Sequence, residues 1–177
     1  LSMDDTLIIY TDGLNAFNSK HNPIQNGTKI LGNGDQSTLF LQLSEDSVIH
    51  LFTNYFVGYY GKDSSVNGVY HTTIIRDPNN RNNFIVAKTT KLANGSNRSV
   101  TAKKASSFDG YWIIFPEWNT SNILIYRLNE NGLRFHRREN ILPQKHIGFS
   151  QLKISPSGRY VALMSCNIPG VDESICI

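Results

Sequence analysis

Glu117, Trp118 and Asn119 are consecutive residues that could bind a sugar. The indole of Trp118 offers a broad apolar face, and the flanking carboxylate and amide can hydrogen-bond hydroxyl groups. The competing interpretation is structural. Trp118 then fills an interface between two sheets and Asn119 lies in a turn, because aromatic side chains dominate core packing and Asn favours turns. We favour packing and keep the three residues as a predicted binding site.

Asp12, Asp109 and Glu117 are the carboxylates that we consider for acid–base catalysis. A glycosidase needs two carboxyl groups about 5–9.5 Å apart across a cleft. Asp12 and Asp109 each precede a glycine, a pairing typical of β-turns, and their positions in the sequence do not bring them together. We therefore predict no catalytic residue, and a hydrolase acting on polysaccharide stays the alternative.

The segment Arg134–Arg138 is rich in basic residues and could contact an anionic glycan or nucleic acid. Alternation along a strand would place Arg134, His136 and Arg138 on one face. Phe135 and Arg137 would then lie on the other face. Long basic side chains also protect an exposed sheet edge from pairing, and we favour this role. Arg134 and Arg138 are retained as predicted binding residues.

No metal site and no cofactor are predicted. The five histidines lack ligand-like spacing with cysteine or carboxylate, and no glycine-rich phosphate loop is present. The loop 77–83 offers several oxygen ligands, but Arg81 interrupts them, so a solvated hairpin loop is predicted rather than a calcium site. Cys166 and Cys176 could form a disulfide in an oxidising compartment or remain thiols, and the sequence leaves both open.

The composition is that of a folded domain. The chain has 177 residues, of which 40% are hydrophobic, enough for a sizeable core. A net charge of +3 is mild and predicts no nucleic-acid partner. No apolar run is long enough to cross a membrane, and no signal-peptide pattern is present. Neither end resembles a natural terminus, which predicts a segment of a longer protein or a trimmed product.

The candidate residues lie on or beside β-prone runs. Four such runs are centred on Ile8, His50, Ile113 and Val161, at intervals of 42, 63 and 48 residues. A four-stranded propeller blade takes about 40–50 residues. The long middle interval requires an insertion, for which the polar stretches near residues 61–68 and 93–99 are the candidates.

Paired strand signals around short polar turns predict β-hairpins at 115–128 and 152–163, and others at 69–90 and 123–137. A single hairpin cannot bury its apolar face alone, so repeated hairpins must stack on one another. We therefore predict an all-β, β-propeller-like fold of three to four antiparallel sheets. Residues 1–177 would form one propeller segment that belongs to a larger closed propeller.

Several segments, taken in order, resemble a known family. They are LIIYTDG (7–13), IHLFT (49–53), GYWIIFPEWNTSNILIY (110–126) and IGFSQLKISPSG (147–158). This order and spacing is similar to that in the amino-terminal, propeller-like region of large surface and secreted proteins of Bacteroidetes, which carry a type IX secretion sorting domain. Phe17, Ile24 and Ser157 depart from the tryptophan, methionine and aspartate of the family pattern.

The resemblance implies a non-enzymatic binding or structural module of an exported protein, with an adhesion or assembly role. It implies a location outside the cell or on its outer surface, and secretion machinery as a partner in transit. Other expected partners are the rest of a larger polypeptide, other protein subunits and glycans. Neither nucleic-acid binding nor membrane insertion is expected. A subunit held in a surface assembly by β-edge pairing is a further alternative.

Overall fold

A computed structural model describes residues 2–3, 6–28, 30–32, 38–44, 48–56, 64–80, 82–95, 99–141, 149–166 and 174–176. Within these ranges the only helical element is a 3₁₀ turn, η1 (Ser64–Val66), and no helix there is long and apolar enough to cross a bilayer. The strands are β1 (Ser2–Met3), β2 (Thr6–Leu7), β3 (Ile9–Thr11), β4 (Asn15–Asn18), β5 (Pro23–Thr28), β6 (Thr38–Gln42), β7 (Ile49–Tyr55), β8 (Gly68–Arg76), β9 (Phe84–Asn94), β10 (Thr101–Lys104), β11 (Tyr111–Pro116), β12 (Asn122–Asn129), β13 (Gly132–Asn140), β14 (Phe149–Ile154), β15 (Val161–Cys166) and β16 (Ser174–Cys176).

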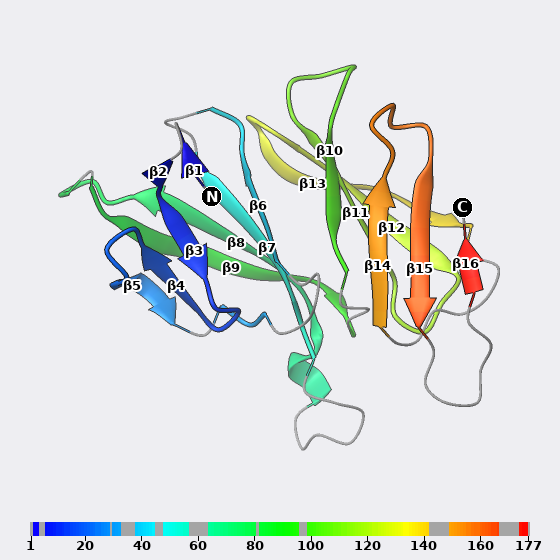
Figure 1. Ribbon diagram of the computed structural model, residues 1–177, viewed down its shortest axis with the longest axis horizontal. Coiled ribbons are helices and arrows are strands. Elements are labelled where there is room, and N and C mark those ends of the chain that lie inside the picture. Colours follow the sequence, from blue (N-terminus) through cyan, green and yellow to red (C-terminus); the bar gives the residue numbers. More distant parts are fainter. Residues whose placement is uncertain are drawn as a thin grey trace.

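The strands form successive antiparallel meanders in chain order, β3–β5, β6–β9, β10–β13 and β14–β16. Figure 1 shows them side by side, from β3–β5 at one end to β14–β16 at the other. The predicted centres His50, Ile113 and Val161 lie in β7, β11 and β15, and Ile8 directly precedes β3. These four strands are four apart in the chain, and the predicted all-β, propeller-like fold is confirmed.

The first two meanders are joined into one seven-stranded sheet, which differs from the separate antiparallel sheets that we expected. One parallel pair, Gln25 opposite Ile85, links β5 to the outer edge of β9. β9 is eleven residues long, and its pairing with β8 shifts register twice, between Val69 and Tyr70 and between Thr73 and Ile74. Such irregularities increase strand twist, which helps this sheet to curl so that β5 meets β9.

Three apolar clusters lie between the meanders. The first joins β3–β5 to β7–β9 and includes Ile9, Ile24, Ile49 and Leu51. The second joins β6–β8 to β11 and β12 through Phe52, Val69, Ile113, Phe115 and Leu128, and the third joins β11 and β12 to β14 and β15 through Ile114, Ile123, Ile125, Leu152 and Leu163. Adjacent residues of β7 and β11 thus serve different clusters, because successive side chains of a strand point to opposite faces.

Two predicted turns owe their geometry to glycine. Gly132 opens β13 at φ 92° after the two-residue loop of the β12–β13 hairpin, and Gly158 has φ 73° between β14 and β15. Glycine adopts this left-handed region without steric cost. In the β8–β9 loop, Oδ1 of Asp77 accepts a hydrogen bond from the Asn79 amide. This oxygen therefore already stabilises the predicted hairpin loop.

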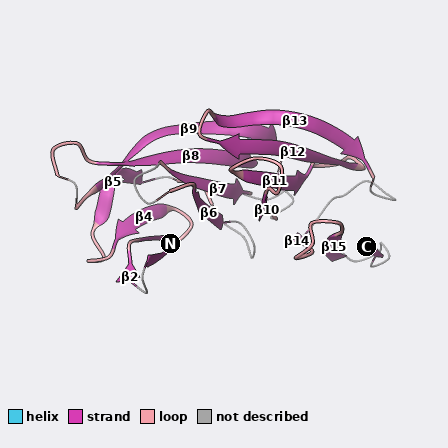
Figure 2. Cartoon of the chain, turned by 90° about the horizontal axis from the view of Figure 1, so that it is seen from above, coloured by secondary structure: helices cyan, strands magenta, loops and turns pink. Residues whose placement is uncertain are grey.

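Viewed from above, β8 and β9 of one sheet and β12 and β13 of the next lie along the same side of the molecule (Figure 2). β4 and β5 lie at one end of the molecule and β14 and β15 at the other, as in Figure 1. The turn after β11 lies beside the end of β9, because the β10–β13 sheet follows and packs against the β6–β9 meander. That neighbourhood holds the predicted binding residues.

Candidate functional site

The turn from Glu117 to Thr120 joins β11 to β12 and carries the predicted Glu-Trp-Asn motif. The Glu117 amide donates to the Asn122 carbonyl at 2.9 Å, which closes the turn. Asn119 has φ 55°, a left-handed conformation that Asn tolerates better than most residues. The prediction that Asn119 lies in a turn is confirmed.

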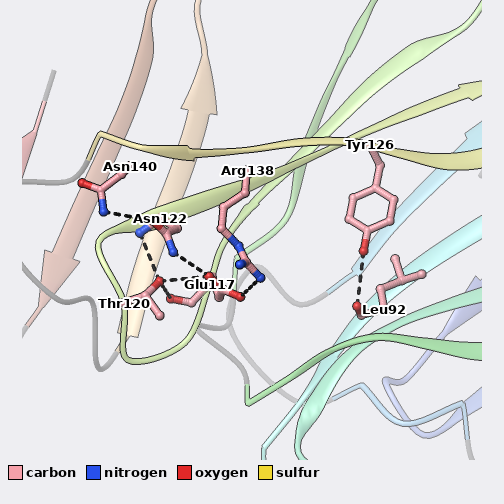
Figure 3. Close-up of polar contacts among 7 residues, drawn as sticks. All are labelled: Leu92, Glu117, Thr120, Asn122, Tyr126, Arg138 and Asn140. Atoms are coloured by element: carbon pink, nitrogen blue, oxygen red, sulfur yellow. Dashed lines mark hydrogen bonds and ion pairs between the residues drawn. The ribbon is translucent and has the colours of Figure 1, made fainter.

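Glu117 is the centre of a polar network at this turn (Figure 3). Its Oε1 accepts from Nη2 of Arg138 at 2.7 Å, and its Oε2 accepts from Nδ2 of Asn122 at 2.8 Å and from Oγ1 of Thr120 at 3.3 Å. Asn140 extends the network by donating from Nδ2 to Oδ1 of Asn122 at 3.0 Å. The Glu117 side chain is 19% exposed, so these hydrogen bonds fix it in place.

A pocket of about 550 Å³ lies beside this network. We call it the Trp118 pocket, and it is lined by residues of β9, the 117–120 turn, β12 and β13, among them Gly95, Glu117, Trp118, Asn119, Tyr126, Phe135 and Arg138. The Tyr126 hydroxyl donates to the Leu92 carbonyl at 3.2 Å (Figure 3), and burial raises the pKa of this phenol. Tyr126 therefore stays a neutral ring fixed at the pocket wall.

Trp118 also packs between two sheets. Its ring lies 5.8 Å from that of Phe56, at the end of β7, and a Cβ placed on Gly95 would come within 2.4 Å of its Cγ. The indole thus lies against the β9 end of the neighbouring sheet and also lines the pocket. The packing interpretation of Trp118 is confirmed. The same side chain also forms part of the pocket wall.

We expect Gly95→Ala to destabilise the protein through contact with Trp118. Gly95 has φ 66°, so alanine adds left-handed strain of about 1–2 kcal/mol, and the clash adds about 1–3 kcal/mol more. Gly132→Ala is the matched control, because Gly132 also has positive φ but no atom lies within 4 Å of an added Cβ. Urea unfolding measures both variants, and equal losses in the two would contradict the proposed contact.

The basic strand β13 does not alternate as expected. Its pairing with β12 sets Phe135 opposite Tyr126 and Arg137 opposite Ile125, so the register shifts at His136. This β-bulge inserts one extra residue and resets the alternation. Phe135 and Arg138 therefore line the Trp118 pocket together, and the prediction that Arg138 shares a face with Arg134 and His136 is wrong.

Arg134 lies outside the Trp118 pocket. Its partner across the pairing with β12 is Arg127, on the sheet face that also carries His136 and Arg137. Of the five predicted binding residues, the structure brings together Glu117, Trp118, Asn119 and Arg138, and it separates Arg134 from them.

The three carboxylates that we considered for catalysis lie in different places. Asp12 is in the β3–β4 turn, where hydrogen bonds from the Asn15 and Leu14 amides lower the pKa of its carboxyl. Asp109 and Glu117 flank the two ends of β11, whose six residues span about 20 Å. This separation exceeds that of a glycosidase pair.

Asp109 lines a second pocket, of about 910 Å³, together with His50 and Arg127. The Arg127 guanidinium lies 3.9 Å from the centre of the Phe108 ring. Nδ1 of His50 is 2.9 Å from Nε2 of His71, and their rings stack at 5.1 Å. Burial lowers the pKa of both imidazoles to about 4.

The sequence did not predict this histidine pair, because neither His50 nor His71 has ligand-like spacing with a cysteine or carboxylate. The available signal was position: His50 lies between Ile49 and Leu51 and two residues before Phe52, so alternation places His50 and Phe52 on one sheet face. Within the described ranges, no three His, Cys, Asp or Glu residues gather as metal ligands would.

The side chains of Cys166 and Cys176 lie outside the described residues. The backbone register sets Cys176 opposite Leu163, three positions along β15 from Cys166. The disulfide stays a prediction, which thiol alkylation with and without prior reduction would test.

No protein-family model matches this chain, and it has no significant match among curated proteins or solved structures. The resemblance to secreted Bacteroidetes proteins therefore stays a prediction.

Proposed function

We propose that this chain is a non-enzymatic, carbohydrate-binding module of an exported protein, and that the Trp118 pocket is its recognition site. The observation that carries the proposal is the convergence of residues from separate elements. Trp118 and Asn119 of the 117–120 turn line the same pocket as Tyr126 of β12 and Phe135 and Arg138 of β13.

The chemistry of the pocket suits a neutral or weakly acidic sugar. Phe135 is 55% exposed, although its ring packs edge-on against Tyr126 at 5.4 Å, so an aromatic surface remains open to a ligand. Arg138 uses Nη2 on Glu117 and has further N–H groups on a side chain that is 57% exposed. Aromatic surface combined with a few fixed polar groups is typical of small-ligand pockets.

The carboxylates favour binding over hydrolysis. Both oxygens of Glu117 already accept hydrogen bonds, from Arg138 on one side and from Thr120 and Asn122 on the other. Such a carboxylate holds the turn and orients Arg138. A polysaccharide hydrolase stays the alternative, and would need a second carboxyl group within about 9.5 Å of the first.

Export and display form the second part of the proposal. They rest on the resemblance to the propeller-like region of type IX-secreted proteins, and the stacked sheets support it. The module would act outside the cell or on its outer surface, in adhesion or assembly, as part of a larger polypeptide or beside other subunits. The sequences that flank this segment test this part: a leader before it and a sorting domain after it are expected.

Arg138→Gln is expected to weaken glycan binding at least about tenfold, because a charge-assisted hydrogen bond to the ligand is lost. Trp118→Ala is expected to abolish binding. Arg134→Gln is the matched control, since Arg134 is on the same strand but outside the Trp118 pocket. A glycan array identifies the ligand and calorimetry measures its affinity. The proposal fails if the intact protein binds no glycan, or if the Arg138 and Arg134 variants bind alike.

A further inference from the structure

A groove of about 720 Å³ lies between the β10–β13 sheet and the β14–β15 hairpin. Its floor is apolar and is formed by Trp112, Ile114, Ile125, Ile154 and Val161. These residues are the open end of the third apolar cluster, in which Leu152 and Leu163 are fully packed. The groove is thus a place where the two sheets separate and leave Trp112, Ile154 and Val161 partly exposed.

The rim of this groove is basic. The rim residues are Lys103, Lys104, His136 and Arg137, and the part of the chain that the structure describes contributes no carboxylate to the lining. We call it the basic groove. Arg137 forms an ion pair with Glu139, whose Oε1 lies 2.8 Å from Nε of Arg137. This ion pair engages one side of the guanidinium and leaves its terminal N–H groups available.

The rim residues are held in place by the surrounding elements. Nζ of Lys103 donates to the Pro156 carbonyl at 2.5 Å, which ties β10 to the turn after β14. The His136 ring lies 4.9 Å from that of Trp112, on the floor of the groove. The β13 bulge brings both His136 and Arg137 to the groove, where strict alternation would have separated them.

We propose that the basic groove binds an amphipathic organic anion: an apolar chain lies along the isoleucine floor and its carboxylate contacts Lys104 and Arg137. The volume is within the range of small-ligand pockets, roughly 300–1,000 Å³. A basic rim alone would attract any anion, but an apolar floor gives no partner to a sugar hydroxyl or a second charge. Floor and rim together therefore select one acidic head and one apolar body.

Octanoate is the probe, and 1-octanol is its matched neutral control. We expect octanoate to bind the intact protein at least about tenfold more tightly than octanol, because only octanoate gains charge-assisted hydrogen bonds at the rim. The double variant Lys104→Gln/Arg137→Gln is expected to lose about tenfold or more in octanoate affinity and to leave octanol binding unchanged. Calorimetry measures the affinities, and NMR shift changes of the isoleucine methyl groups locate the site.

Two variants serve as controls. Lys20→Gln removes an exposed lysine of the β4–β5 turn, outside the groove, and should leave octanoate affinity unchanged. Trp118→Ala should also leave it unchanged, which separates this site from the Trp118 pocket. Circular dichroism checks that each variant is folded. Failure of octanoate to bind at millimolar concentration, equal binding of octanol, or equal affinity in the double variant would each overturn the proposal.

Discussion

Phe115→Ala is expected to lower the free energy of unfolding by about 3–5 kcal/mol. Phe115 is fully buried in the second apolar cluster, where β11 and β12 pack against β6–β8. Its ring stacks on that of Tyr126, with centroids 5.5 Å apart and an interplanar angle of 20°. Removing it leaves a cavity between two sheets that share no strand pairing within the described residues, so it weakens the packing that holds them together.

Phe135→Ala is the matched control for this prediction. Phe135 also contacts Tyr126, as its cross-strand partner on β13, but its side chain is 55% exposed, so its loss should cost well under half as much. Chemical denaturation compares the two variants, with one common m-value for the dependence of the unfolding free energy on denaturant concentration. Comparable losses would mean that the sheets are not held by the second cluster, and the propeller-like packing would need to be reconsidered.

The sequence predicts the strands because the relevant signals are local. The hairpins β11–β12, β12–β13 and β14–β15 follow from β-prone runs around short polar turns, and Gly132 and Gly158 have the positive φ that such turns use. The four-strand repeat is also local in origin, because β6–β9 and β10–β13 each form a four-stranded meander of consecutive strands. A period-two pattern of side chains cannot predict where a β-bulge interrupts it. The bulge at His136 in β13 is such an interruption.

The sequence predicts most residues of the candidate site, but it does not predict how they come together in space. Glu117, Trp118 and Asn119 were identifiable as neighbours in a turn. Their meeting with Arg138 depends on the β13 bulge and on how two sheets stack, and both are long-range outcomes of packing. The link between β5 and β9 is long-range in the same way, because it joins the edges of two meanders by a single parallel pair.

Acidification from pH 7.5 to pH 5 is expected to lower the free energy of unfolding by roughly 2–4 kcal/mol through His50 and His71. In the folded chain burial lowers the pKa of both to about 4, from a usual value of 6.5. Between these pH values the unfolded chain binds protons that the folded chain does not, so stability is complete above about pH 6.5 and declines as the pH falls toward 4.

The hydrogen bond between the two rings also predicts that stability falls as the pH is lowered. The two imidazoles share one hydrogen bond of 2.9 Å between Nδ1 of His50 and Nε2 of His71, in which one nitrogen must donate and the other accept. Protonating both rings leaves two donors facing each other, and the residues are only 6% and 8% exposed. Most carboxylates remain ionised at pH 5, which makes the histidines the main titrating groups in this window.

Thermal and urea unfolding at pH 7.5, 6 and 5 measure this dependence. The double variant His50→Gln/His71→Gln should flatten the slope of stability against pH, whatever its absolute stability. His136→Gln, which removes an exposed histidine of β13, should leave the slope intact. A pH-independent stability in the unmodified protein, or a slope that persists in the double variant, would show that the buried pair does not couple folding to protonation.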